Sequence, residues 1–288
     1  MTLDHSKVSK LGFGVSGPHA SHLLVEKHTI HRIREAVDLG VTVFDTAPFY
    51  KDWPGSIGSS LAEIRLGKAL KSIDRTNVVL ATKIGAKSKA EQSFSASCIE
   101  DSLNGSLSRL KTDFVDILFL QGPRPADWTD ETLAALAALK QAGKIRAIGI
   151  SGRGKELDAV FDHDLIDVLM APSHVSISET DGKRIKKAKS KGLTIIGIES
   201  MYGATHPSGT GRSPGRLWYD VRKFYHRLRP EMEPELPALP VPLISQADAY
   251  DWSLNKLGVD CVLTLTTNAD HLRQNAAVIG LDGRPRTA

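Results

Sequence analysis

Four polar side chains occupy corresponding places in the chain, each at the end of a short apolar run. Asp45 closes one such run, and Lys83, Gln121 and Ser151 follow the next three. Tyr50 comes five residues after Asp45. If these runs are parallel strands of one barrel, their carboxyl ends meet at one rim, where the active sites of such barrels lie. The sequence therefore predicts that these five side chains converge.

An acid, a phenol and an amine at one rim have a coherent chemistry. A phenol has an ordinary pKa of about 10, so it is a weak acid at neutral pH. A neighbouring ammonium group such as that of Lys83 stabilises the phenolate and lowers this pKa, and Asp45 keeps the lysine charged and oriented. Tyr50 could then protonate a carbonyl oxygen as hydride reaches the carbon. The alternative is a buried Asp45–Lys83 ion pair that is purely structural, with Tyr50 as a packing residue.

The elements that would position these residues form a regular series. Eight apolar runs alternate with segments of helical period, and several are apolar throughout, which is typical of parallel strands covered on both faces. The expected strands are 10–15, 41–45, 78–82, 115–120, 145–150, 166–171, 193–198 and 261–266. The expected helices are 28–39, 58–72, 95–110, 130–142, 155–161, 179–190, 245–257 and 268–279. Eight such repeats predict one α/β domain, a (β/α)8 TIM barrel over residues 1–288.

One irregular stretch, residues 202–243, interrupts the series after the seventh strand. It is rich in proline and glycine and contains a helical pattern at 218–229. Long insertions in compact domains are usually functional or disordered. We expect either a lid over the site or a loop without a role, and the sequence leaves both open.

The first expected strand carries a literal G-x-G-x-x-G pattern at Gly12, Gly14 and Gly17. This pattern could mark a Rossmann dinucleotide site, but such a unit has an acid just after its second strand. Here Asp38 falls inside a helical pattern before that strand. We therefore assign the glycines to the first barrel strand and a ligand loop.

Composition and charge narrow the class of protein. The net charge is +4, and the basic residues gather at 183–191 and 212–229. The first interpretation of these two clusters is a solvated helix face and a basic loop, and the second is a binding site for a phosphate-bearing small ligand. No nucleic-acid motif accompanies them, so no nucleic-acid partner is expected. No apolar run approaches the ~20 residues of a membrane span, the first residues do not resemble a signal peptide, and the histidines lack zinc-like spacing. We expect a cytoplasmic protein with no membrane partner and no metal.

The segment F-D-T-A-P-F-Y at 44–50 resembles the aldo-keto reductase motif F-D-T-A-x-x-Y. Residues 57–58, 66–70, 81–83, 106–116, 143–151 and 268–275 also resemble that family, in order along most of the chain. The resemblance implies a TIM barrel, a nicotinamide cofactor that is usually NADPH, with NADH as the alternative, and reduction of small aldehydes or ketones. It implies that Tyr50 is the proton donor, that Lys83 tunes it and that Asp45 supports the lysine.

The cofactor-binding positions implied by the resemblance fall in two groups. Near the nicotinamide, Ser151 and Gly152 stand where the family has Ser-Asn, while Met170, Ile198 and Glu199 replace its usual contacts. The adenosine end keeps matching residues, namely Thr266, Thr267, Asn268, Gln274 and Asn275. Leu265 takes the place of a frequent phosphate-binding lysine, and the cation could come from Arg212, Arg216, Arg222 or Arg273. Glu199 is expected to pair with one of these arginines or to turn outward.

Gln121 stands where the family usually has histidine at the end of the fourth strand. An amide can donate a hydrogen bond to a substrate oxygen but cannot titrate. Two functions remain open. The first is an NAD(P)H-dependent oxidoreductase that reduces an aldehyde or ketone, or oxidises the matching alcohol, with NADP favoured. The second is a barrel that acts without net redox, by proton transfer next to a carbonyl, or that only binds a ligand.

Overall fold

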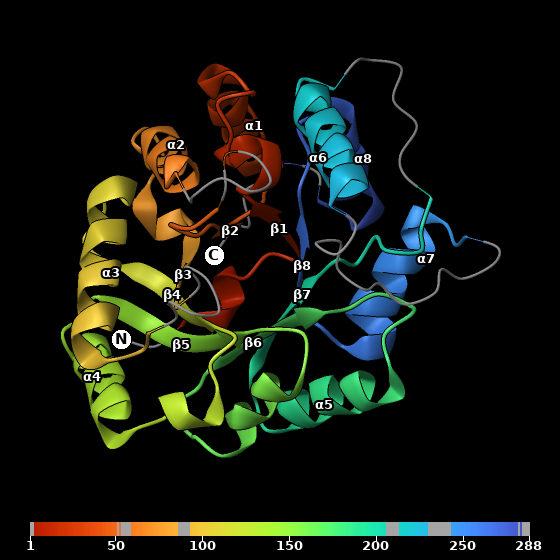
Figure 1. Cartoon of the computed structure of the whole chain (residues 1–288). Helices are drawn as coiled ribbons and strands as arrows, with labels where there is room; N and C mark the ends of the chain where they lie inside the picture. Colours follow the sequence, from red (N-terminus) through yellow and green to blue (C-terminus); the bar gives the residue numbers. More distant parts are fainter. Residues whose placement is uncertain are drawn as a thin grey trace.

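The computed structural model describes residues 3–50, 52, 59–85, 93–205, 213–229, 243–281 and 283. Eight parallel strands follow one another around a closed barrel, and the last strand pairs with the first (Figure 1). The strands are β1 Leu11–Gly14, β2 Val43–Asp45, β3 Val79–Ile84, β4 Val115–Gln121, β5 Ile145–Ser151, β6 Val168–Pro172, β7 Thr194–Ile198 and β8 Cys261–Thr264. The predicted single-domain (β/α)8 barrel is confirmed, and β1 with its glycines belongs to it, so no Rossmann unit is present in the described residues.

Helices surround the barrel (Figure 1). They are α1 Glu26–Asp38, α2 Leu61–Leu70, α3 Ala96–Leu110, α4 Asp130–Gln141, α5 Glu179–Ser190, α6 Arg216–Leu228, α7 Gln246–Asp251 and α8 Ala269–Val278. The glycines that end α1, α4 and α5, namely Gly40, Gly143 and Gly192, all have positive φ. Glycine adopts this left-handed conformation without the steric cost of a side chain, so each helix can end sharply before the next strand.

Two segments differ from the expected α-helices. Residues Lys155–Phe161 form a 3-10 helix, whose preceding turn is fixed by the Glu156 carboxylate, which accepts N–H bonds from Arg153 at 2.7 Å and Gly154 at 3.0 Å. The helix expected at 245–257 divides into α7 and a π-helix, Trp252–Leu257. In the π-helix the buried Ser253 hydroxyl donates to the carbonyl of Ser173, so tertiary contacts decide the local helix type here.

The core has an inner and an outer layer, because side chains alternate between the two faces of each strand. Inside the barrel lie residues such as Val43, Ala81 and Phe119, and the neighbours Phe44 and Leu80 pack outward against the helices. This alternation fixes which polar residues at the strand ends face the barrel axis.

The insertion after β7 is anchored to the rim at its base. Ala204 and Ile244 form an isolated bridge, and the helix expected at 218–229 is confirmed as α6. The Trp218 indole N–H donates to the carbonyl of Asp52 at 3.0 Å, which ties α6 to the loop after β2. Residues 206–212 and 230–242 lie outside the described residues, so the lid stays a prediction.

Helices α2 and α3 meet at Gly67, where backbone approaches backbone. A Cβ added at Gly67 would lie 2.5 Å from the Arg109 carbonyl oxygen and 2.8 Å from that of Leu110. The same helix pair buries Glu63, which accepts from Arg109 Nε at 2.6 Å and from the Thr82 hydroxyl of β3 at 2.7 Å. Close helix contact therefore seats α2 behind β3, the strand that carries Lys83.

We expect Gly67→Ala to lower the free energy of unfolding by about 2 kcal/mol, because the new methyl group forces two backbones apart. Gly182→Ala in α5 is the matched control, since its Cβ would meet only ordinary contacts at 3.9 and 4.0 Å. That variant should gain up to about 1 kcal/mol from helix propensity. Urea denaturation measures both changes, and a Gly67→Ala variant as stable as the unsubstituted protein would contradict the packing argument.

Candidate active site

The last polar side chains of β2, β3 and β4 face the interior of the barrel. Asp45 comes two residues after Val43, and Lys83 and Gln121 come two residues after Ala81 and Phe119, which lie inside the barrel. Since the side-chain period of a strand is two, all three share the inner face. Ser151 pairs in register with Gln121.

The strands that carry these residues run further than the sequence indicated. β3 reaches Ile84, β4 includes Gln121 and β5 includes Ser151, whereas these polar residues were expected to follow their strands. Continued pairing with the neighbouring strands explains the difference. The hydrogen bonds between neighbouring strands therefore fix the backbone at Lys83, Gln121 and Ser151.

The predicted convergence of Asp45, Tyr50 and Lys83 is present in the structure. The Lys83 ammonium donates to the Asp45 carboxylate in a short ion pair, to the Thr46 carbonyl at 3.1 Å and to the Tyr50 hydroxyl at 3.0 Å. The Tyr50 hydroxyl donates to the second Asp45 oxygen at 3.3 Å. An ammonium group has three N–H donors, so all three are satisfied although Lys83 is only 3% exposed.

The electrostatics of the cluster differ from the expected direction at Tyr50. Burial, together with the Asp45 carboxylate, raises the pKa of Tyr50 to about 12, and the opposing effect of Lys83 is smaller. The prediction of a lowered pKa is therefore wrong in this state. Burial disfavours the charged lysine, but Asp45 and the phenol outweigh it and raise the pKa of Lys83. At neutral pH the cluster holds an ammonium and a protonated phenol.

Packing beneath the cluster depends on one glycine. Phe119 and Gly149 are register partners on β4 and β5, and a Cβ at Gly149 would lie 2.4 Å from the Phe119 ring. The ring thus occupies the space that a side chain on β5 would need. Lys83 Nζ lies 5.9 Å from the centre of this ring, so Phe119 is an apolar neighbour of the ammonium inside the barrel.

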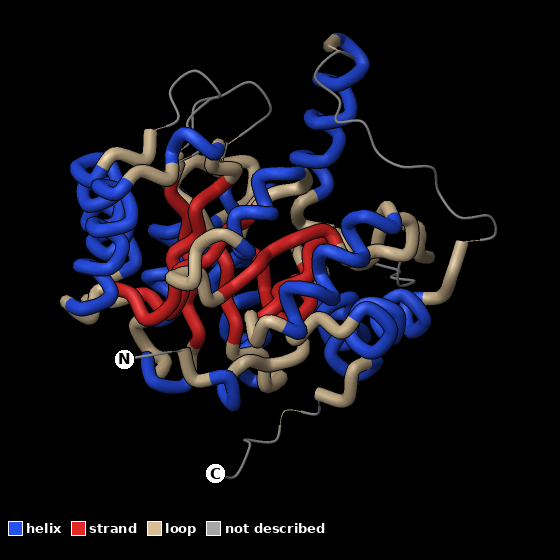
Figure 2. The backbone as a smooth tube through the Cα atoms, turned by 90° about the horizontal axis from the view of Figure 1, so that it is seen from below, coloured by secondary structure: helices blue, strands red, loops and turns tan. Residues whose placement is uncertain are grey.

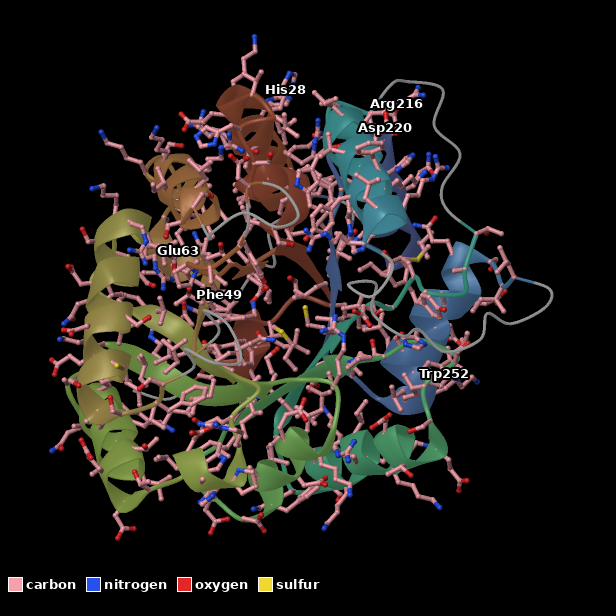
Figure 3. All side chains as sticks on the ribbon, viewed as in Figure 1. His28, Phe49, Glu63, Arg216, Asp220 and Trp252 are labelled. Carbon is pink, nitrogen blue, oxygen red and sulfur yellow. The ribbon has the colours of Figure 1, made fainter. Side chains whose placement is uncertain are left out.

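The outer wall beside the phenol is aromatic. The rings of Phe49 and Tyr50 meet edge to face at 5.8 Å, and both side chains are half-buried. In the view of Figure 3, Phe49 lies nearer the centre of the molecule than Glu63 of α2, which bonds Thr82 of β3. Trp53, another aromatic residue that the sequence places in this loop, lies outside the described residues, as do residues 57–58 of the family resemblance.

The end of β5 explains one departure from the family pattern. Ser151 is buried, and a Cβ at Gly152 would lie 2.3 Å from the Glu156 carboxylate. A side chain at position 152 cannot coexist with this placement of Glu156. The family's Ser-Asn is thus replaced by a glycine with a carboxylate folded over it.

Among the described residues, Glu199 does not pair with Arg216, Arg222 or Arg273, three of the arginines proposed for it. It forms an ion pair with Arg153, which the sequence analysis had not selected. Glu199 itself has positive φ, 58°, directly after β7. The two loops after β5 and β7 are therefore joined by opposite charges.

Two rings at the same edge were not selected from the sequence either. His174 follows β6 and Tyr202 follows β7, and their rings lie 4.8 Å apart. His174 is buried, and burial lowers its pKa, so the imidazole is neutral at pH 7. The one available signal was their position after strand ends, which loop residues share too widely to be distinctive.

The five residues predicted for the adenosine end lie between the end of β8 and the middle of α8. Thr267 bonds the Ser213 hydroxyl at 2.5 Å and accepts from Gly215 N–H at 3.2 Å. Asn268 caps α8, and Asn275 donates to Thr264 at 2.7 Å. The two remaining residues are Thr266, directly before Thr267, and Gln274, which is half-buried on α8.

Of the four arginines suggested as a phosphate-binding cation, three are described. Arg273 on α8 pairs with Glu35 at 2.7 Å and with Asp270 at 2.9 Å. Arg216 lies 3.5 Å from Asp220. Arg222 stands over the Trp218 ring, at 5.5 Å from its centre. Arg212 lies outside the described residues.

The chain is similar to known proteins over most of its length. The model of the aldo/keto reductase family matches residues 10–205. L-galactose dehydrogenase of Arabidopsis thaliana is 30% identical over 294 residues, which cover 95% of this chain and 85% of that protein. Aldo-keto reductase YhdN of Bacillus subtilis is 32% identical over 62% of this chain and 52% of its own length.

Among solved structures, the holo form of aldo-keto reductase AKR11C1 from Bacillus halodurans superposes with a TM-score of 0.71 and 24% identity, covering 95% of this chain and 87% of that one. This likeness concerns the fold. The family itself follows from the sequence matches, which span most of the chain. The chain belongs to the aldo/keto reductase family.

Proposed function

We propose that this protein reduces an aldehyde or ketone with hydride from NADPH, with Tyr50 as the proton donor. The observation that carries the proposal is the buried cluster in which Lys83 contacts both Asp45 and a protonated Tyr50. Family membership supports an oxidoreductase acting on a small carbonyl compound. In reduction, hydride adds to the carbonyl carbon and the Tyr50 proton to the oxygen, so that an alcohol leaves.

Each residue of the cluster has a distinct part in this reaction. Tyr50 gives up its proton, and the phenolate that forms is stabilised by the Lys83 ammonium 3.0 Å away. Asp45 keeps Lys83 charged and fixed in place. Gln121, on the inner face at the end of β4, donates its amide N–H to the substrate oxygen but supplies no proton.

In line with the family resemblance, we place a nicotinamide dinucleotide across the rim. The hydroxyls and amides of Thr266–Asn268 and Asn275, with Gln274, would hold the adenosine end, and Ser151 and Gly152 the nicotinamide end. A bound dinucleotide supplies or accepts the hydride. Arg153 neutralises Glu199, which removes the charge repulsion that Glu199 alone would impose on a pyrophosphate. The insertion 202–243, tied to Thr267 and Asp52, would then close over the cofactor.

A second function keeps the same cluster without hydride transfer. Glu156 fills the space beside Gly152 where the family usually has an asparagine side chain. If this carboxylate blocks the nicotinamide, the cluster could still move protons next to a carbonyl. Titration of NADPH and NADH fluorescence separates the two functions, since only the reductase must bind one of them. Absence of binding at millimolar concentration would refute the redox proposal.

The variant Tyr50→Phe removes only the hydroxyl. We expect the variant to fold and to bind the cofactor as before, while carbonyl reduction falls by at least about a hundredfold, the lower end of general acid catalysis. Tyr225→Phe on α6 is the matched control and should keep its activity. Near-normal turnover in Tyr50→Phe would exclude Tyr50 as the donor.

The pKa of about 12 at Tyr50 predicts opposite pH profiles for the two directions. Reduction uses the protonated phenol, so its rate should not depend on Tyr50 ionisation between about pH 6 and 9. Alcohol oxidation uses the phenolate, whose small fraction grows about tenfold per pH unit, so that rate should climb with pH.

Lys83 opposes the high pKa, so its removal should depress oxidation more than reduction. Lys83→Met removes this charge alone, and thermal melting checks that the variant folds, because it leaves the buried Asp45 carboxylate without its cation. Stopped-flow rates in both directions check this. Equal losses in both directions would mean that Lys83 does not act through the phenol.

Arg273 should favour NADP over NAD. We expect Arg273→Met to weaken NADPH binding by about tenfold, the effect of one lost charged contact, and to leave NADH binding unchanged. Arg34→Met, an exposed arginine on α1, is the control. Calorimetry measures the Kd of NADPH and of NADH. An equal effect of the substitution on both would show that Arg273 does not discriminate between them.

A further inference from the structure

Helix α6 combines an exposed apolar stripe with a dense positive charge. Leu217, Val221, Phe224 and Leu228 recur at spacings of four, three and four residues, so they lie on one face of the helix. Leu217, Phe224 and Leu228 are 55%, 63% and 65% exposed. In the described residues seven large apolar side chains are exposed, and three of them are on this one helix.

The same helix carries five basic side chains and one carboxylate. The basic residues are Arg216, Arg222, Lys223, Arg227 and Arg229, which caps the helix, and the carboxylate is Asp220. All six are exposed. On a helical projection Arg227 and Arg222 lie on opposite sides of the apolar stripe. A strip of apolar residues bordered by cations is the pattern of helices that lie in the surface of an anionic membrane.

The packing of α6 leaves this face accessible. The helix is held at its start, where Gly215 N–H donates to Thr267 at 3.2 Å and Trp218, 8% exposed, packs beside Gly17. Figure 2 shows α6 rising clear of the barrel at the upper right of the view, with its last turns away from the body. Its contacts lie on the side of Trp218, while Phe224 and Leu228 lie on a different side of the helix.

We propose that α6 binds the surface of a membrane rich in anionic lipid headgroups. The apolar stripe enters the boundary between headgroups and acyl chains, and the cations pair with the headgroup phosphates. This is attachment to a surface, since no helix in the described part of the chain has the length and apolar character to cross a bilayer. A second copy of the chain is the poorer occupant, because two such helices would bring their net positive charges together. The proposal departs from the expectation of no membrane partner.

Two variants separate the apolar from the electrostatic contribution. Phe224→Ser with Leu228→Ser removes the stripe, and Lys223→Gln with Arg227→Gln removes two charges. We expect the full chain to sediment with vesicles of phosphatidylglycerol and phosphatidylcholine and not with phosphatidylcholine alone. Each double variant should bind at least about tenfold more weakly, with circular dichroism and thermal melting unchanged.

The basic helix α5 provides the matched control. Lys183→Gln with Lys186→Gln removes two exposed charges from a helix that exposes no comparable apolar stripe in the described residues, and it should leave vesicle binding unchanged. An equal loss in this control would show nonspecific attraction by net charge and overturn the proposal. Absence of sedimentation with anionic vesicles would overturn it as well. So would light scattering that shows a dimer abolished by Phe224→Ser with Leu228→Ser, because the stripe would then be an interface between copies.

Discussion

A lysine ammonium inside a barrel is tolerable only because a carboxylate lies against it. Removing an ion from water costs several kcal/mol, and Asp45 and Lys83 are only 4% and 3% exposed. The pair therefore depends on the contacts that hold it. β2 and β3 are neighbours in which Asp45 pairs with Ala81, so Lys83 lies two residues further along on the same inner face and its ammonium reaches the Asp45 carboxylate. The Thr46 carbonyl and the Tyr50 hydroxyl satisfy the remaining N–H groups.

The apolar interior below this pair explains why the charge stays at the rim. Val43, Ala81, Phe119 and Met170 fill the barrel, so an ammonium group displaced inward would meet only apolar side chains. The Phe119 ring reaches across because Gly149 leaves room for it. Packing inside the barrel and chemistry at its end are thus two consequences of one alternation of side chains along the strands.

In the loops after β5 and β7, two departures from the family pattern, at positions 152 and 199, are each compensated by a nearby residue. Glu156 takes the space beside Gly152 and bonds two backbone N–H groups there. The neighbouring Arg153 is then directed to Glu199 on the loop after β7. Two carboxylates that would each oppose a phosphate group are in this way bonded within the protein. A cofactor would meet a surface at this edge whose carboxylates are already paired.

The sequence by itself determined the barrel, the order of its strands, the α6 segment and the three residues of the Asp45, Tyr50 and Lys83 cluster. These follow from period and spacing, because apolar alternation and glycine stops are local properties of the chain. Only the tertiary structure decided what depends on distant neighbours. Burial by the whole barrel raises the pKa of Tyr50 above its ordinary value, although the adjacent lysine acts in the opposite direction. The partner of Glu199 is Arg153, 46 residues away. The helix that begins as α7 continues as a π-helix beside Ser173. Spacing along the chain carries no information about such contacts, since they arise when separate loops close on the same rim.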